Sequence, residues 1–227
     1  MLLARIGKRV LRPGGRRLTE LMLAHTPLGG DIVEVAPGLG RTTRLILSHS
    51  PSSYRGVDLD PQVVRIIGEL TASRNGACIL ADAASTGLPD GCADTVIGEA
   101  MLSMQGQSGK SRIVGETFRL LRPGGTYSIH ELGLHPDDLD QSTKDVIRTD
   151  LARAIKVNAR PLTEAEWKEL LEQAGFDVVW TAHSPMALLK LGRNLSDEGV
   201  TGEPQLRRRL HAEEEGLAAS EHHPDAG

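Results

Sequence analysis

Short apolar runs alternate with helical patterns along the first part of the chain. Five runs have the length and composition of buried strands, and each is set off by loop residues such as glycine, proline, aspartate or serine. The runs cover residues 32–35, 54–58, 77–81, 93–98 and 126–132. Alternation of this kind predicts an α/β fold, in which helices cover both faces of a doubly wound, mostly parallel sheet.

The predicted helices carry local start and stop signals. One helix is expected over residues 16–25. Another begins with Asp60 as its N-cap and Pro61 as its first residue, since a carboxylate accepts from the free N–H groups and proline has no N–H to lose. A helix over 110–121 is expected to stop at the Arg-Pro-Gly-Gly turn of residues 122–125.

The pattern changes after the fifth run. Residues 135–160 are charged and helix-prone, and we expect a helical lid there whose apolar face comprises Val146, Ile147, Leu151 and Ile155. Thr163 and Glu166 then have the spacing of a capping box. Residues 176–182 and 185–191 are expected to form an antiparallel hairpin at one edge, which makes a predicted sheet of seven strands.

This pattern divides the chain into three parts. Residues 1–29 are expected to form cover helices, residues 30–192 the main domain, and residues 193–227 a polar tail. Residues 1–19 carry six basic side chains and no acidic one, with apolar residues on one helical face. A membrane-surface helix is one interpretation, but a short cover helix with a solvated basic face is favoured.

Composition narrows the class of protein. The net charge of −4 across 227 residues does not indicate nucleic-acid binding. Cys78 and Cys92 have no metal-like spacing, so we expect neither a metal site nor a disulfide framework. No apolar run reaches the roughly 18 residues of a membrane span, and Arg5 interrupts any secretory segment. We therefore expect a cytoplasmic protein without stable membrane insertion.

The stretch from Asp31 to Gly40 is the strongest candidate for a ligand site. A buried run is followed by Pro37, Gly38 and Gly40 and then by a helix, which is the ligand-binding corner of doubly wound α/β folds. The free N–H groups of the helix start favour an anionic ligand group. A dinucleotide fingerprint would need a third glycine, and the run 36–41 lacks it.

Five segments in order resemble the motifs of class I S-adenosylmethionine-dependent methyltransferases. They span roughly residues 30–192 and are similar to the small-molecule family, type 11, that includes the ubiquinone and menaquinone biosynthesis enzymes. The segments are residues 34–40, 56–61, 81–83 with Leu88 and Pro89, 93–97 and 121–125. Ala36 departs from the pattern, which usually has glycine there, and its methyl group is expected to narrow the approach of the ligand. Ala93 departs too, where phenylalanine is common.

The resemblance implies S-adenosylmethionine as the cofactor and assigns roles around its adenosine half. Asp58 would hold the ribose hydroxyls, and its place eighteen residues beyond Gly40 agrees with the usual spacing of a ribose-binding carboxylate. Leu59 would pack on the adenine face. Asp82 would accept from the adenine amino group, helped by the backbone N–H of Ala83.

For the methionine half, the same resemblance implies a backbone cradle and nearby carboxylates. The glycine turn would approach the methionine part, Glu34 would lie near its ammonium group and Glu99 would border the sulfonium. The residues concerned are Glu34, Ala36, Pro37, Gly38, Gly40 and Glu99.

Methyl transfer from a sulfonium needs positioning more than a nucleophilic side chain, and a base only if the acceptor must lose a proton. The candidates are His130 and Glu131, then His135, while alternation along a strand sends His130 and Glu131 to opposite faces. Each also fits a partnered residue at a strand end, so the catalytic residue stays open. The expected acceptor is a small molecule, and the oligomeric state is open.

Two other classes of function remain. One is a protein that binds the cofactor without turnover, and the other is a nicotinamide-dependent oxidoreductase, which the missing glycine disfavours. Catalysis on nucleic acid is disfavoured because aromatic residues for base stacking make up only 3% of the chain and no Asn-Pro-Pro-Tyr-like motif follows residues 93–98.

Overall fold

Five parallel strands form the central sheet of the protein. The computed structural model describes residues 15–185. The strand order is β3-β2-β1-β4-β5, so the chain moves outward from β1 in one direction and then returns to its other side at β4. The strands are β1 (Asp31–Val35), β2 (Ser53–Asp58), β3 (Gly76–Leu80), β4 (Ala93–Glu99) and β5 (Leu121–His130). The predicted doubly wound parallel sheet is confirmed.

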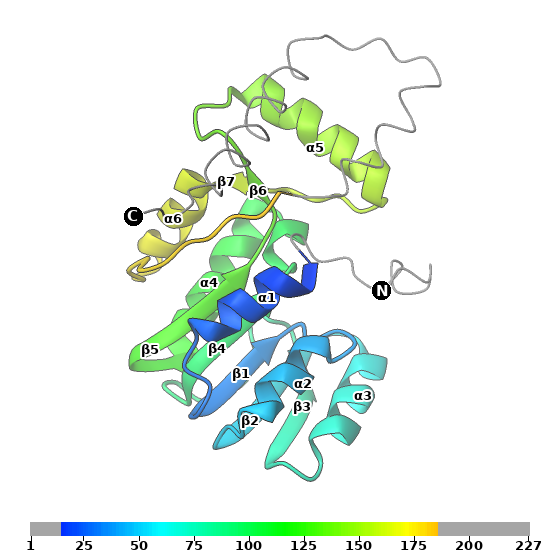
Figure 1. The fold of residues 1–227 in the computed structure, drawn as a ribbon, viewed down its shortest axis with the longest axis vertical. Helices are drawn as coiled ribbons and strands as arrows, with labels where there is room; N and C mark the ends of the chain where they lie inside the picture. The colour runs from blue at the N-terminus through cyan, green and yellow to red at the C-terminus, as the bar shows by residue number, and fades with distance from the viewer. Residues whose placement is uncertain (1–14, 186–227) are drawn as a thin grey trace, which may run out of the picture. The chain divides into compact units, whose positions relative to one another are not determined.

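Helices cover both faces of the sheet (Figure 1). One face carries α1 (Gly15–Ala24), α2 (Arg41–Ser48) and α3 (Pro61–Thr71), and the other carries α4 (Gln107–Leu120) and α6 (Glu164–Gln173). Both predicted caps form. Asp60 accepts from the Gln62 amide at 2.8 Å, and Thr163 and Glu166 make a reciprocal capping box.

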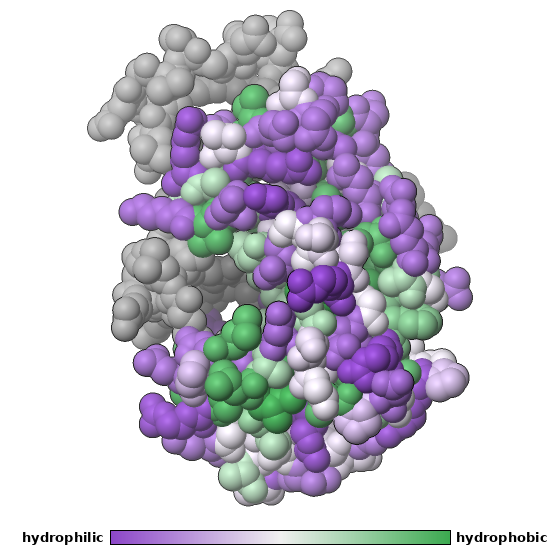
Figure 2. Space-filling view, turned by 180° about the vertical axis from the view of Figure 1, so that it is seen from behind, coloured by the Kyte–Doolittle hydropathy of each residue, from purple (hydrophilic) through white to green (hydrophobic). Residues whose placement is uncertain are grey.

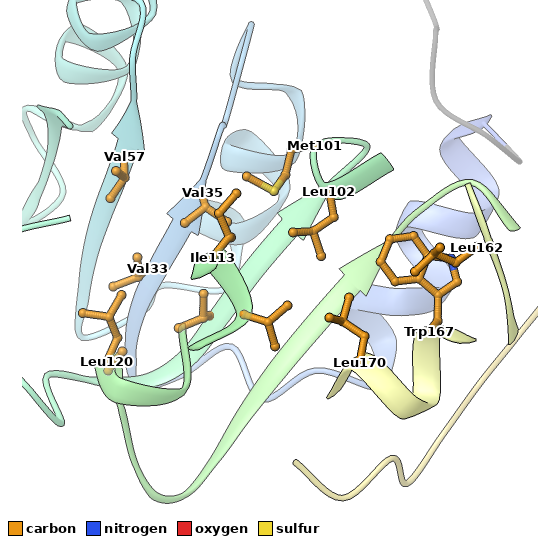
Figure 3. Packing of buried hydrophobic residues seen from close by; sticks show 13 residues of the cluster. Val33, Val35, Val57, Met101, Leu102, Ile113, Leu120, Leu162, Trp167 and Leu170 are labelled. Atoms are coloured by element: carbon orange, nitrogen blue, oxygen red, sulfur yellow. The ribbon is translucent and has the colours of Figure 1, made fainter. Parts of the chain in front are cut away.

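Apolar side chains pack against β1 from both faces, because a parallel strand in the middle of a sheet is buried on each side. Val35 belongs to the cluster with Ile113 of α4 and Trp167 of α6 (Figure 3). Ile32 packs with Ile46 and other residues of the opposite layer. The surface on the side turned away from the viewer in Figure 1 is mostly hydrophilic, apart from a group of apolar residues in the lower half of the view (Figure 2).

The turn predicted at residues 122–125 lies inside β5. Leu121 pairs with Ala93 and Thr126 pairs with Thr95, so the residues between them form an irregularity in the ladder. The Arg122 guanidinium bonds Asp94 at 2.7 Å and Asp31 at 2.9 Å, and thereby links β5 to β4 and β1. Strand pairing continues past the glycines because these ion pairs hold the bulged segment to its neighbours.

The segment after β5 contains the helix expected in the lid region. It is α5 (Gln141–Ile155), flanked by the short parallel pair β6 (Gly133–Leu134) and β7 (Leu162–Thr163). The predicted apolar face is wrong at one position, because Val146 is 60% exposed. Lys144 is buried instead, and its ammonium contacts Glu166 at 2.8 Å. Lys144 lies two helical turns before Leu151 and so shares its buried face. Val146 points about 140° away from Leu151 around the helix axis.

The first closing strand is not seen among the described residues. Residues 176–182 have no strand, and residues 186–191 of the second lie outside the described part of the chain, as do the basic segment 1–14 and the tail. Aromatic contacts hold residues 176–182 against helical elements. Phe176 packs edge-on against Phe118 of α4, and Trp180 stacks on His25 with ring centroids 4.2 Å apart. The seven-stranded sheet therefore stays a prediction.

Candidate active site

The candidate site residues gather at the carboxyl edge of the sheet. Val35 of β1 pairs with Val57 of β2 on one side and with Gly98 of β4 on the other, while Glu99 pairs with His130 of β5. The ends of four strands therefore lie next to one another, at the point where the chain changes direction between β1 and β4. Ligands of doubly wound folds bind in the crevice at such a point.

The turn after β1 contains three residues with left-handed backbone, namely Ala36 (φ 55°), Gly38 (φ 56°) and Gly40 (φ 69°). A Cβ on Gly38 would meet only the Ala36 carbonyl oxygen, at 4.0 Å, so this glycine faces open space. A Cβ on Gly40 would lie 2.8 Å from Ile67 Cδ1. The space beside Gly38 is therefore open on the outer side of the turn. Gly40 has no Cβ that would clash with Ile67, so the start of α2 can pack closely against α3.

The side chain of Ala36 is half-buried. Its methyl group packs against the apolar cluster that contains Val35 and Ile113. The narrowing of the ligand's approach by this methyl group stays a prediction. Pro37, next in the turn, is buried, and its carbonyl accepts from the Gly40 amide at 3.1 Å.

Asp58 lies at the end of β2, beside the glycine turn. Burial raises the pKa of its carboxyl group, and the backbone amides of Asp60, Gly38 and Leu59 oppose that rise. The Asp60 amide donates to Oδ1 at 2.9 Å. Because the Gly38 amide acts on the same carboxylate, the structure brings together the two residues on which the ligand-site hypothesis depends.

Apolar and acidic side chains follow at the ends of β2 and β3. Leu59 is 68% exposed and Leu80 is 58% exposed. Asp82 comes next in the chain; its Oδ1 accepts from the Ala84 amide at 2.9 Å and its Oδ2 lies 3.6 Å from the Arg112 guanidinium. The half-exposed carboxylate is thus held by a tight turn, with Ala83 inside it.

Glu34 belongs to a buried network beneath α2. Its side chain accepts from Thr43 Oγ1 at 2.7 Å and from the Tyr54 hydroxyl at 2.6 Å. Burial and the charge of Glu34 raise the pKa of Tyr54. Sequence analysis missed both partners, because Thr43 and Tyr54 have polar and charged residues as neighbours in the chain and no local signal distinguishes them. The network fastens the start of α2, and with it the glycine turn.

Glu99 and His130 form a buried pair at the ends of β4 and β5. Glu99 Oε1 lies 2.9 Å from His130 Nδ1 and accepts from Thr19 of α1 at 2.7 Å, while Thr42 of α2 donates to Oε2. The side chains of Glu99 and His130 are 8% and 4% exposed. Sequence analysis missed Thr19 and Thr42. The pair therefore connects two helices with the edge of the sheet.

Glu131 points to the opposite face from His130, as strand alternation predicts. Its carboxylate accepts from the backbone amides of Met101, Leu102 and Ser103 and from the Ser103 hydroxyl, at 2.7–3.0 Å. Burial raises the pKa of Glu131, and these bonds oppose the rise. The Glu131 carboxylate thus accepts its hydrogen bonds from the loop that contains the 3-10 helix η2 (Leu102–Met104). His135 is exposed.

Within residues 15–185, no three histidine, cysteine, aspartate or glutamate side chains are grouped so that they would hold a metal ion. The same residues contain no helix with the length and apolar character that crossing a membrane requires.

Residues 33–129 match a family described as a methyltransferase domain. The chain belongs to the S-adenosylmethionine-dependent methyltransferases. A protein of Haemophilus influenzae that is itself uncharacterized is 32% identical over 207 residues, which cover 88% of this methyltransferase and 80% of the relative. The resemblance found in the five sequence motifs is confirmed.

Two solved structures show how widely this fold is shared. A methyltransferase candidate from Bacillus halodurans is 14% identical, with a TM-score of 0.62 and coverage of 71% of this chain and 70% of that one. Phosphoethanolamine N-methyltransferase 2 of Haemonchus contortus, solved with S-adenosyl-L-methionine, is 16% identical, with a TM-score of 0.61 and coverage of 93% and 46%. At these identities the likeness concerns the fold alone.

Proposed function

We propose that this methyltransferase binds S-adenosylmethionine at the carboxyl edge of β1, β2 and β3 and transfers its methyl group to a small-molecule acceptor. One observation carries the proposal: the turn that is open at Gly38 lies beside the end of β2, where the Ala36 amide donates to the carbonyl of Val57, the residue before Asp58, at 2.8 Å. A ligand that reaches both Gly38 and Asp58 needs a sugar with neighbouring hydroxyl groups and a polar extension.

The adenosine half lies over β2 and β3 in this proposal. Asp58 in its ionised form accepts hydrogen bonds from the two ribose hydroxyls. Leu59 presents an exposed apolar side chain to the adenine ring. Asp82 accepts from the adenine amino group, and the Ala83 amide donates to a ring nitrogen.

The methionine half lies against the turn formed by Ala36, Pro37, Gly38 and Gly40, where the amides at the start of α2 favour its carboxylate. Glu34 places a buried negative charge beneath this turn, which favours the ammonium group. Glu99, at the end of the adjoining strand, borders the sulfonium.

When bound, the cofactor supplies a methyl group activated by the positive charge on sulfur. The protein orients that group toward the acceptor and excludes water from the line between them. Thr19 of α1 reaches Glu99 at the carboxyl end of β4, and α5 packs on Leu132 just after β5, so we place the acceptor on that side of the cofactor (Figure 1).

Calorimetry with S-adenosylmethionine and with S-adenosylhomocysteine tests the site. Replacement Asp58→Ala should weaken binding by about 1.5–3 kcal/mol, which is roughly ten- to hundredfold, because a charge-assisted hydrogen-bond acceptor is lost. Asp138→Ala, at an exposed position, is the matched control and should bind as the unmodified protein does. Equal affinity of the two variants would remove Asp58 from the site.

A further inference from the structure

The imidazole of His130 has one partnered and one unpartnered nitrogen. The residue is 5% exposed, and Nδ1 lies 2.9 Å from Glu99 Oε1. Nε2 is buried and has no hydrogen-bond partner among the described residues. A buried polar atom without a partner has lost its hydration and gained no bond in return, so such atoms are rare in folded proteins and mark sites of strain or chemistry.

The surroundings of Glu99 determine which nitrogen carries the proton. The hydroxyl groups of Thr19 and Thr42 donate to its two oxygens, and the His130 ring meets the same carboxyl group. This favours the ionised carboxylate, which only accepts. In the neutral imidazole, Nδ1 of His130 must then donate to Glu99, and Nε2 keeps a lone pair that can accept a proton.

The strand order places this lone pair on one side of the site. β2 and β3, with Asp58 and Asp82, lie on one side of β1, whereas β4 and β5 lie on the other. With adenosine over β2 and β3, the methyl group lies near the β1–β4 junction and His130 lies beyond it. His130 is therefore on the acceptor side of the cofactor.

We propose that His130 is the general base of this methyltransferase, that Glu99 is its positioning residue, and that the acceptor is a hydroxyl compound of the phenol or enol type. The proposal rests on the function proposed above. Nε2 takes the hydroxyl proton, the oxygen lone pair forms the bond to the methyl carbon, and the carbon–sulfur bond breaks with its electrons on sulfur. The products are a methyl ether and S-adenosylhomocysteine; the imidazolium then returns its proton to water. An acceptor amine that arrives neutral would not need this base.

The tautomer is measured first, because that experiment needs no acceptor. Long-range ¹⁵N–¹H correlation spectra of the full-length protein, labelled at its histidine rings and recorded at about pH 8, separate the two neutral tautomers. His130→Asn identifies the signal, since asparagine keeps a donor toward Glu99 but has no counterpart of Nε2. We expect Nδ1 protonated and Nε2 unprotonated. A proton on Nε2 would overturn the proposal.

Turnover is measured next as release of S-adenosylhomocysteine, with a panel of phenols and catechols and a matched panel of primary amines. We expect turnover of hydroxyl compounds and a loss of about 10²- to 10⁴-fold in His130→Asn, the range for a general base, with cofactor affinity changed less than twofold. Glu99→Gln should lower kcat less and shift the tautomer signal of His130.

Turnover of amines alone, or full activity of His130→Asn with phenols, would overturn the proposal. Failure of the unmodified protein to bind S-adenosylmethionine would instead contradict the proposed function and leave the tautomer result standing.

Discussion

The hydroxyl group of Thr19 donates a 2.7 Å hydrogen bond to Glu99, a residue eighty positions further along the chain. Thr19 is fully buried on α1, and Glu99 ends β4. This bond fastens the first described helix to the edge of the sheet where the candidate site lies. Changes in α1 are therefore expected to reach the site through Glu99.

Replacement Thr19→Val should lower the free energy of unfolding by about 1–2 kcal/mol, because it keeps the shape of the side chain but removes a donor to a buried carboxylate. Urea denaturation measures this change. Thr149→Val is the matched control; its hydroxyl bonds only the helix backbone at Asp145, and its side chain is exposed. Equal effects of the two replacements would show that the bond to Glu99 adds no stability.

Replacement Ala36→Gly tests the departure from the usual glycine. Glycine relieves roughly 1 kcal/mol of left-handed strain, but it gains entropy in the unfolded chain and loses a packed methyl group, so stability should fall by less than about 1 kcal/mol. Affinity for S-adenosylmethionine should change less than twofold, because the methyl group packs on the apolar cluster. Lys156→Gly, at φ 56° and exposed, isolates the backbone effect. A large gain in affinity would show that the methyl group does restrict the ligand.

Replacement Glu131→Gln should destabilise the fold by about 1–3 kcal/mol. One of its oxygens becomes an amide group that donates, and it then faces the amide donors of residues 101–103. Thermal and chemical denaturation measure the loss, with Glu172→Gln on the exposed side of α6 as control. A stable variant that has lost only turnover would instead support Glu131 as the base.

Lys110 predicts a dependence of stability on alkaline pH. The side chain is 1% exposed, its ammonium donates to the carbonyl groups of Gln105 and Arg160, and burial lowers its pKa from 10.5 to about 8. Between these two values the unfolded chain binds more protons than the folded one. The stability contributed by Lys110 therefore rises with pH across this window, with a slope that approaches about 1.4 kcal/mol per pH unit.

The measurement compares unfolding of the unmodified protein with that of Lys110→Met from pH 7 to pH 10. The difference in free energy should shift in favour of the unmodified protein as the pH rises. Lys168 is the contrasting control, because its ion pair with Glu164 raises its pKa, so its contribution is lost as the pH rises through that higher value. A flat difference for Lys110 would show that its charge carries no burial penalty.

Local signals in the sequence predicted the elements that depend on neighbouring residues. Asp60 with Pro61 starts α3, and Thr163 with Glu166 caps α6, because cap and partner lie within one helical turn. Gly38 and Asp58 were predicted to share a site because parallel strands end at the same edge of a sheet. That inference needs only the order and the type of the elements.

Tertiary structure alone decided which polar groups meet. The hydrogen-bond partners are Thr19 and His130 for Glu99, Tyr54 for Glu34, and Ser103 for Glu131. Each pair is at least twenty residues apart in the chain. Residues 176–182 have the composition of a strand, yet their aromatic side chains pack against α4 and His25, and they pair with no strand within residues 15–185. Hydrogen bonds and ring contacts act over only a few ångströms, so they depend on how distant segments pack, which periodicity along the chain does not contain.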